Sequence, residues 1–163
     1  MFKKIIELEQ TFLLGKSMRM SINENQTQIL WQKFMPMKRH IKNISSTDFY
    51  SMQIYDHLHE FENFDPAVVF TKWAAVEVKN LSEIPEGLDS HVLQAGLYAV
   101  FVHRGRPEQF PATFAYIFQQ WLPNSIYQLD HREQFELLPE NYRPDDPDAI
   151  EEVWIPIILK PNQ

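Results

Sequence analysis

Two stretches of the sequence, Ile29–Pro36 (ILWQKFMP) and Tyr116–Pro123 (YIFQQWLP), share one pattern of aromatic residues and proline. In each stretch two aromatic residues stand three positions apart, and a proline follows the second aromatic by two positions. Side chains three positions apart lie on the same face of an α-helix, and a proline ends or kinks a helix. Both stretches are therefore predicted to form amphipathic helices that pack onto a flat apolar surface.

The segments around these predicted helices also repeat in order and type. One strand candidate precedes each helix and two follow it, as indicated by their β-branched and aromatic residues. The strand candidates are Thr11–Ser21, Tyr50–Tyr55 and Val68–Val78 in the first half, and Leu97–His103, Gln134–Leu138 and Val153–Leu159 in the second. Trp73 and Trp154 occupy similar places in the last strand of each half.

This repetition predicts an α+β fold made of two duplicated β-α-β-β units. Two such units most simply form an antiparallel sheet with pseudo-two-fold symmetry, backed by two main helices. The expected half-repeats span about residues 11–79 and 95–160, and Asn80–Gln94 with its Pro-Glu-Gly turn is interpreted as the linker between them. Chance similarity between two amphipathic helices is the alternative, and agreement across four elements favours duplication.

The composition is that of one globular domain, residues 1–163. The chain has 163 residues and a formal charge of −7, with 44% hydrophobic and 23% charged residues. The acidic balance argues against direct binding of nucleic acid or of an anionic membrane, since both require a basic surface. No stretch is apolar enough for a secretion signal or a membrane helix, so a soluble cytoplasmic protein is expected.

Several motifs of enzyme and cofactor chemistry are absent from the sequence. There is no cysteine, which excludes disulfides, thiolate nucleophiles and Cys-ligated metals. His57 and His59 have no evident third ligand nearby, so no metal site is expected. No GxSxG, P-loop or GxGxxG motif occurs, and no cofactor is expected. The acidic run Asp145–Glu152 is interpreted as a solvated turn before the last strand.

Glu136 is the first candidate for a functional residue, because it is a carboxylate inside the apolar strand segment FELL. Alternation along a strand puts Glu136 on one face and its neighbours Phe135 and Leu137 on the other. On a face covered by aromatic residues the carboxylate would lose hydration and need a counter-charge, which a bound organic cation can supply. The alternative, which sequence physics alone favours, is that Glu136 points to solvent or pairs with Arg132 or Arg143.

Aromatic residues make up 13% of the chain, and most of them are expected in the core. A binding groove needs only a few aromatic side chains exposed along the seam between the two halves. Tyr and Trp suit such a groove because each offers a polar atom as well as a flat face. The aromatic candidates for ligand binding are Trp121, Tyr55, Trp73, Phe64 and Tyr98.

Several segments together resemble the GyrI-like, AraC-type effector-binding domain family. They are Gly15-Lys16, Gly96–Phe101 leading to Gly105, Trp121–Ser125, Phe135-Glu136 and Glu151–Ile157. The resemblance spans about residues 11 to 159 and depends on the order and spacing of these motifs. It implies a fold of duplicated β-α-β-β units, in agreement with the repeat found in the residues.

The resemblance also implies a binding site. In this family the groove between the two units binds small molecules, often cationic and aromatic, and the acidic residue of a Phe-Glu motif lies at its base. That position corresponds to Glu136. The family motif more typically continues to an aromatic residue, often Tyr, where this chain has Leu138. Relatives often carry a helix-turn-helix or winged-helix segment, for which the two halves leave no room here.

Three functions remain open at this point. The first is a stand-alone module that binds a hydrophobic, cationic aromatic ligand and senses or sequesters xenobiotics, as a multidrug-binding relative of bacterial transcription regulators. The second is a hydrolase of reactive aromatic compounds, in which Glu136 with Tyr55 or Tyr98 would activate water. The third is a protein-interaction module resembling a DNA gyrase inhibitor, whose charge of −7 would imitate or mask a DNA-binding surface of a protein partner.

Overall fold

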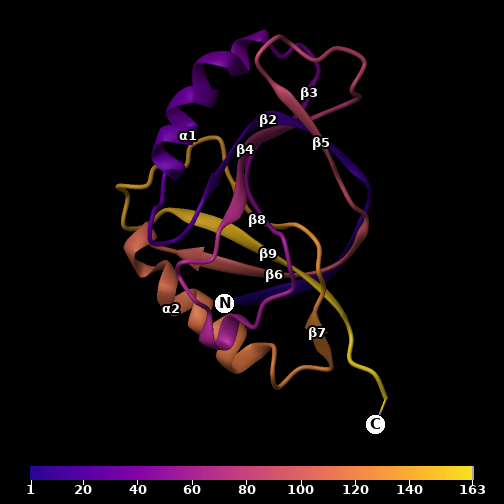
Figure 1. Cartoon of the computed structure of the whole chain (residues 1–163), viewed down its shortest axis with the longest axis vertical. Helices are drawn as coiled ribbons and strands as arrows, with labels where there is room; N and C mark the ends of the chain where they lie inside the picture. Colours follow the sequence, from indigo (N-terminus) through magenta and orange to yellow (C-terminus); the bar gives the residue numbers. More distant parts are fainter. Residues whose placement is uncertain (163) are drawn as a thin grey trace.

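The computed structural model describes residues 1–162, in which nine strands form an antiparallel sheet backed by helices (Figure 1). The strand order is β1-β6-β9-β8-β3-β4-β2-β5, and β7 pairs with β9 off this path. The strands are β1 (Phe2–Leu8), β2 (Thr11–Met20), β3 (Ile44–Tyr55), β4 (Phe70–Val78), β5 (Asp89–Leu93), β6 (Gly96–Arg104), β7 (Tyr127–Leu129), β8 (Gln134–Leu138) and β9 (Ile150–Leu159). The fold class is α+β, as the sequence predicts.

The two predicted helices are present, and both lie on the same side of the sheet (Figure 1). The helical elements are α1 (Thr27–Phe34), η1 (Met35–His40), η2 (Phe61–Asn63), η3 (Pro107–Gln109), α2 (Phe110–Ala115) and η4 (Tyr116–Trp121). The α-helix α1 ends at Phe34, two residues before Pro36, and Pro36 stands in the first turn of the 3-10 helix η1 that follows. The second aromatic stretch forms η4, a π-helical turn that continues α2.

The two halves of the sheet meet where β3 pairs with β8. In that pairing Met52 lies opposite Phe135. The outer neighbours of these two residues are Trp73 on β4 and Trp154 on β9. The tryptophans therefore occupy equivalent positions about a pseudo-two-fold axis, as their places in the sequence indicate.

The same register defines equivalent positions on the side that carries the helices. The residues that follow Met52 and Phe135 are Gln53 and Glu136, and their neighbours on β4 and β9 are Lys72 and Val153. Because successive side chains of a strand point to opposite faces, these four lie on the other face from the two tryptophans. Gln53 of the first half is thus equivalent to Glu136 of the second, and Lys72 of the first half is equivalent to Val153 of the second.

Apolar side chains cover both faces of the sheet. The cluster on the helix-bearing side includes Leu30 and Phe34 of α1 and Phe118 of η4. The cluster on the opposite side contains Tyr50, Met52, Trp73, Tyr98, Phe135 and Trp154 among others. The central strands are consequently apolar on both faces, so their sequences do not show which face the helices cover.

Three segments differ from the sequence prediction, which includes none of the strands β1, β5 and β7. Residues 80–94 are predicted to be a linker, but Asp89–Leu93 form β5, which pairs with β2. Within this short strand Leu93 is buried and His91 half-buried, so the alternation is too brief to stand out. The strand β1 is also unforeseen, because its side chains are exposed or half-buried, as is common at the edge of a sheet.

Among the described residues, no helix has the length and apolarity required to cross a membrane.

Gly15 of β2 permits a close approach to β4. A Cβ atom at this position would overlap the carbonyl oxygen of Ala74 and lie 2.8 Å from the Cα of Ala75. We expect Gly15→Ala to lower the free energy of unfolding by about 1–3 kcal/mol, because backbone would have to move. Urea denaturation measures this change. Ser17→Ala on the same strand adds no atom and should change the free energy by less than about 0.5 kcal/mol, so equal effects would disprove the role of Gly15.

Candidate functional site

Three polar side chains form a cluster in the middle of the sheet, on the side that carries the helices. This central polar cluster consists of Gln53 of β3, Lys72 of β4 and Glu136 of β8. Only 8% of the Lys72 side chain and 13% of the Glu136 side chain is exposed. A carboxylate this far buried needs a compensating charge and hydrogen bonds.

Lys72 supplies the compensating charge. Gln53 Nε2 donates a hydrogen bond to Glu136 Oε2 at 2.8 Å, and Lys72 Nζ donates one to Gln53 Oε1. Lys72 Nζ also lies 3.7 Å from Glu136 Oε1. Neither arginine considered from the sequence takes this role, because Arg132 pairs with Asp130 and Arg143 is exposed. Glu136 is therefore neutralised from within the chain.

A second buried carboxyl, that of Glu151 on β9, interacts with the cluster. Burial, followed by the charge of Glu136, raises the pKa of Glu151 to about 7, while a hydrogen bond with Tyr142 and the charge of Lys72 lower it. Burial and the charge of Glu151 in turn raise the pKa of Tyr142. The prediction of a solvated turn over Asp145–Glu152 is wrong for Glu151, because β9 begins at Ile150 and Glu151 is buried within it.

An aromatic cluster surrounds Tyr55 at the end of β3. The ring centroid of Tyr55 lies 5.0 Å from that of Phe61 and 5.5 Å from that of Phe64. The ring of Phe61 also contacts Phe118 of η4, with 4.9 Å between centroids. The segment 61–64 therefore links the first half of the sheet to the helix of the second half. Burial and then the charge of Glu136 raise the pKa of Tyr55, so the aromatic cluster lies within electrostatic reach of the carboxylate.

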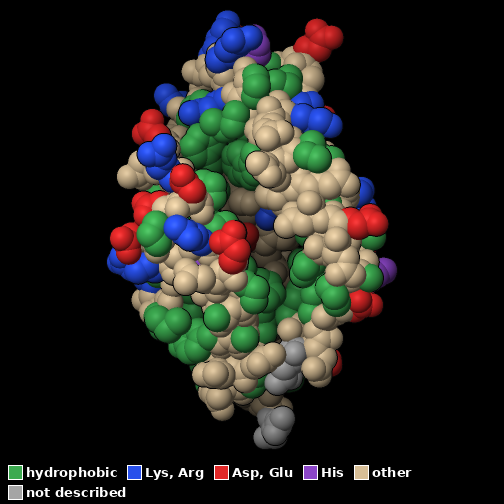
Figure 2. All heavy atoms as spheres, turned by 90° about the vertical axis from the view of Figure 1, so that its left-hand side faces the viewer, with side chains coloured by type: hydrophobic (Ala, Val, Ile, Leu, Met, Phe, Trp, Pro, Cys, Tyr) green, Lys and Arg blue, Asp and Glu red, His purple; other side chains and the backbone are tan. Residues whose placement is uncertain are grey.

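The helix-bearing side is hollowed near its middle (Figure 2). Hydrophobic side chains surround this hollow, and both basic and acidic side chains lie at it. On this side α1 packs over β2 and β4, while Trp121 and Tyr116 of η4 contact Phe101 of β6. The central polar cluster lies between these two covered parts of the sheet.

The structure brings together three of the residues predicted to bind a ligand, namely Glu136, Tyr55 and Phe64. Two others, Trp73 and Tyr98, lie in the apolar cluster on the opposite side of the sheet. Strand alternation explains this, because Trp73 directly follows Lys72 of the central polar cluster. The hydroxyl of Tyr98 donates to the carbonyl of Glu133 at 2.8 Å, so Tyr98 does not face Glu136 as a catalytic partner would.

Trp121 lies on the helix-bearing side but at its outer part. Its ring stacks on Phe2 of β1, with 5.1 Å between centroids, and meets the edge of Phe101 of β6. It also stacks on Tyr127 of β7. These contacts hold η4 against the β1–β6 side of the sheet, away from β3 and β8.

Sequence reasoning missed Gln53, Lys72, Glu151 and Tyr142. Lys72 and Glu151 are charged residues inside apolar strand segments, which is the signal that singled out Glu136. For Glu151 the acidic run before it hid that signal. No metal site emerges here, since within residues 1–162 no group of three His, Asp or Glu side chains is placed to hold an ion.

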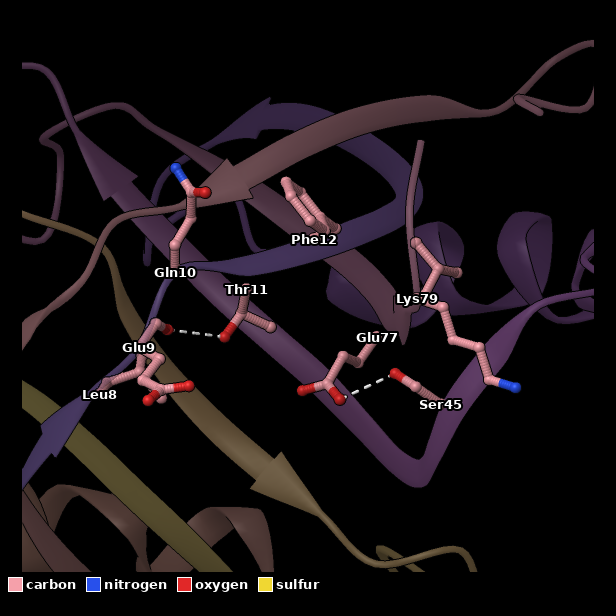
Figure 3. A pocket seen from close by; sticks show the side chains of 9 residues that line it. Leu8, Glu9, Gln10, Thr11, Phe12, Ser45, Glu77 and Lys79 are labelled. Carbon is pink, nitrogen blue, oxygen red and sulfur yellow. Dashed lines mark hydrogen bonds between the residues drawn. The ribbon is translucent and has the colours of Figure 1, made fainter. Parts of the chain in front are cut away.

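A pocket of about 360 Å³ lies on the face of the sheet opposite to the helices. Its lining residues are 8–12, Ser45 and 77–79 (Figure 3). In Figure 3 the side chains of Glu77 and Ser45 point toward each other. Glu77 accepts hydrogen bonds from Ser45 Oγ at 2.8 Å and from the Tyr50 hydroxyl at 3.1 Å. The carboxylate of Glu77 therefore already has hydrogen-bond partners within the chain.

A smaller pocket of about 280 Å³ lies near the start of β9. Its lining residues are Asp48, Leu137, Pro139, Ile150, Glu151 and Glu152. Burial and then the charge of Glu152 raise the pKa of Asp48. Ile150 and Glu152 alternate with Glu151 along β9, so this pocket lies on the side of the tryptophans and not on the side to which the Glu151 carboxyl points.

Solved structures with the same fold cover almost the whole chain. SAV2435 bound to tetraphenylphosphonium is 16% identical with a TM-score of 0.72, over 97% of this chain and 94% of that chain. The EcmrR C-terminal domain is 12% identical with a TM-score of 0.70, over 98% and 99% of the two chains. A hydrolase encoded by lin2189 from Listeria innocua is 9% identical with a TM-score of 0.55, over 95% and 91%.

A search of curated protein sequences gave no match. The family comparison gave one that extends over nearly the full length. The model of the GyrI-like small molecule binding domain matches residues 1–158. The chain therefore belongs to the GyrI-like family of small-molecule binding domains.

Proposed function

We propose that this chain binds hydrophobic, cationic aromatic molecules in the hollow on its helix-bearing side and thereby senses or sequesters xenobiotics. The observation that carries the proposal is the buried carboxylate of Glu136 close to the aromatic cluster around Tyr55. A cation that takes the place of Lys72 at this carboxylate would gain Coulomb attraction that bulk water does not weaken. Aromatic faces would add about 0.5–2 kcal/mol each through cation–π interactions.

Two proteins with the same fold support this proposal, one for the ligand class and one for the link to a regulator. SAV2435 was solved with tetraphenylphosphonium, which is an aromatic cation of the kind proposed here. EcmrR was solved in a complex with DNA, and its C-terminal domain shares this fold. A ligand-binding role coupled to a regulator is consistent with both relatives.

Replacement of Glu136 tests the role of the carboxylate. Glu136→Gln keeps the shape of the side chain and removes its charge. We expect the wild type to bind tetraphenylphosphonium and Glu136→Gln to bind it about tenfold or more weakly in isothermal titration calorimetry. Glu140→Gln removes the same charge at an exposed residue after β8 and should change the dissociation constant by less than about twofold. Equal binding by wild type and Glu136→Gln would refute the proposal.

Glu151 should make cation binding depend on pH. The groups that act on it are Glu136, Lys72 and Tyr142, and His103 lies opposite it in the β6–β9 pair. With a pKa of about 7, Glu151 is protonated in acid and ionised in base, and a bound cation favours the ionised form. We therefore expect affinity for tetraphenylphosphonium to rise about three- to tenfold between about pH 6 and about pH 8. Glu151→Gln should abolish the rise, and a rise that persists in this variant would assign it to another group.

A hydrolase is the second candidate. The observation that favours it is Glu151, whose pKa of about 7 and hydrogen bond with Tyr142 suit general acid–base catalysis beside Glu136. A protein with this fold is described as a hydrolase. Tyr55 remains available as the partner of Glu136, whereas Tyr98 lies on the other side of the sheet.

Styrene oxide, a strained aromatic electrophile, tests the hydrolase. If the chain activates water, the wild type should form the diol faster than buffer does, and Glu136→Gln should lose this activity. Chromatography of the product measures the rate. Diol formation at the buffer rate would exclude this reaction and leave ligand binding as the function.

A further inference from the structure

Lys72 occupies the place at which a ligand cation would meet Glu136. Its ammonium lies 3.7 Å from Glu136 Oε1, and Gln53 is hydrogen-bonded to both partners. Both charged side chains are almost completely withdrawn from water. The charge of the carboxylate is therefore compensated before any ligand arrives.

We propose that Lys72 is the resident counter-ion of Glu136, which a cationic ligand must displace, and that it thereby determines which ligands the hollow accepts. The inference rests on the proposed binding function. With Lys72 in place, an approaching cation is repelled by the ammonium as well as attracted by the carboxylate, and at similar distances these energies nearly cancel. A neutral aromatic ligand experiences neither. Lys72 thus reduces the preference for cations that an unpaired carboxylate would create.

Lys72 can leave Glu136 without losing every partner. Its ammonium ends a flexible four-carbon stem, and its hydrogen bond runs to Gln53 rather than to Glu136. Its charge also acts on Glu151, which is a second carboxyl within its electrostatic reach. A move toward Glu151 would keep the ammonium compensated while a ligand takes its place at Glu136 Oε1.

The strand geometry does not require a lysine at this position. The equivalent residue of the other half is Val153, an apolar residue with 1% exposure. The same strand geometry therefore accepts an apolar side chain. Lys72→Met, which keeps the length of the stem, should fold, and its circular dichroism spectrum checks this.

The test compares tetraphenylphosphonium with neutral triphenylphosphine oxide by calorimetry at about pH 8, above the pKa of about 7 of Glu151. We expect Lys72→Met to bind the cation about tenfold or more tightly than the wild type. Lys72→Gln is also uncharged, offers a second variant, and should show the same gain. Lys33→Met removes the same charge at an exposed residue of α1 and should stay within about twofold of the wild type. Binding of the neutral oxide should change by less than about threefold in every variant.

Unchanged or weaker binding of the cation by both Lys72 variants, with wild-type binding intact, would overturn the role of Lys72 and leave the binding function standing. An equal gain for the neutral oxide would also overturn it, because opened space rather than lost charge would then explain the effect. If neither the wild type nor any variant binds either compound, the proposed binding function itself is refuted, and this inference with it.

Discussion

The pairing of β3 with β8 is the contact on which the candidate site depends. It joins the two halves of the sheet and places Glu136 opposite Ser51, one residue away from the Met52–Phe135 pair. Because side chains alternate along a strand, a shift of one residue in β8 would turn Glu136 to the side of the tryptophans and bring Phe135 to the helices. The packing of Phe135 against Met52 and the tryptophans on the opposite side therefore holds the carboxylate on the helix-bearing side.

The site arises where the two halves of the fold differ. The register makes Gln53 equivalent to Glu136 and Lys72 equivalent to Val153. Two carboxylates facing each other across the axis would repel, and burial would force one of them to take up a proton. One amide and one carboxylate instead form a hydrogen bond across the axis. The near-symmetric sheet thus places these residues close together, and the differences between the two halves give the site its charged side chains.

Local patterns predicted the two helices and six of the nine strands, because aromatic spacing and alternation are visible within ten residues or so. They also predicted that Glu136 and Phe135 point to opposite faces. They could not predict the partner of Glu136, since Lys72 reaches it only through the pairing of β4 with β3 and of β3 with β8. Both faces of β4 are apolar, so nothing local shows that Lys72 rather than Trp73 faces the helices.

A buried ion pair is a weak way to stabilise a sheet, because the cost of removing both charges from water often exceeds their attraction. An apolar pair at the positions of Lys72 and Glu136 would serve the core as well or better. The pair does have one property that an apolar pair lacks. It keeps the carboxylate compensated while the hollow is empty, so the ligand-free form holds no isolated buried charge. A ligand cation would then exchange with an ammonium instead of meeting a bare carboxylate. Such an exchange lowers affinity and makes release easier, which suits a domain that reports the presence of a compound better than one that traps it.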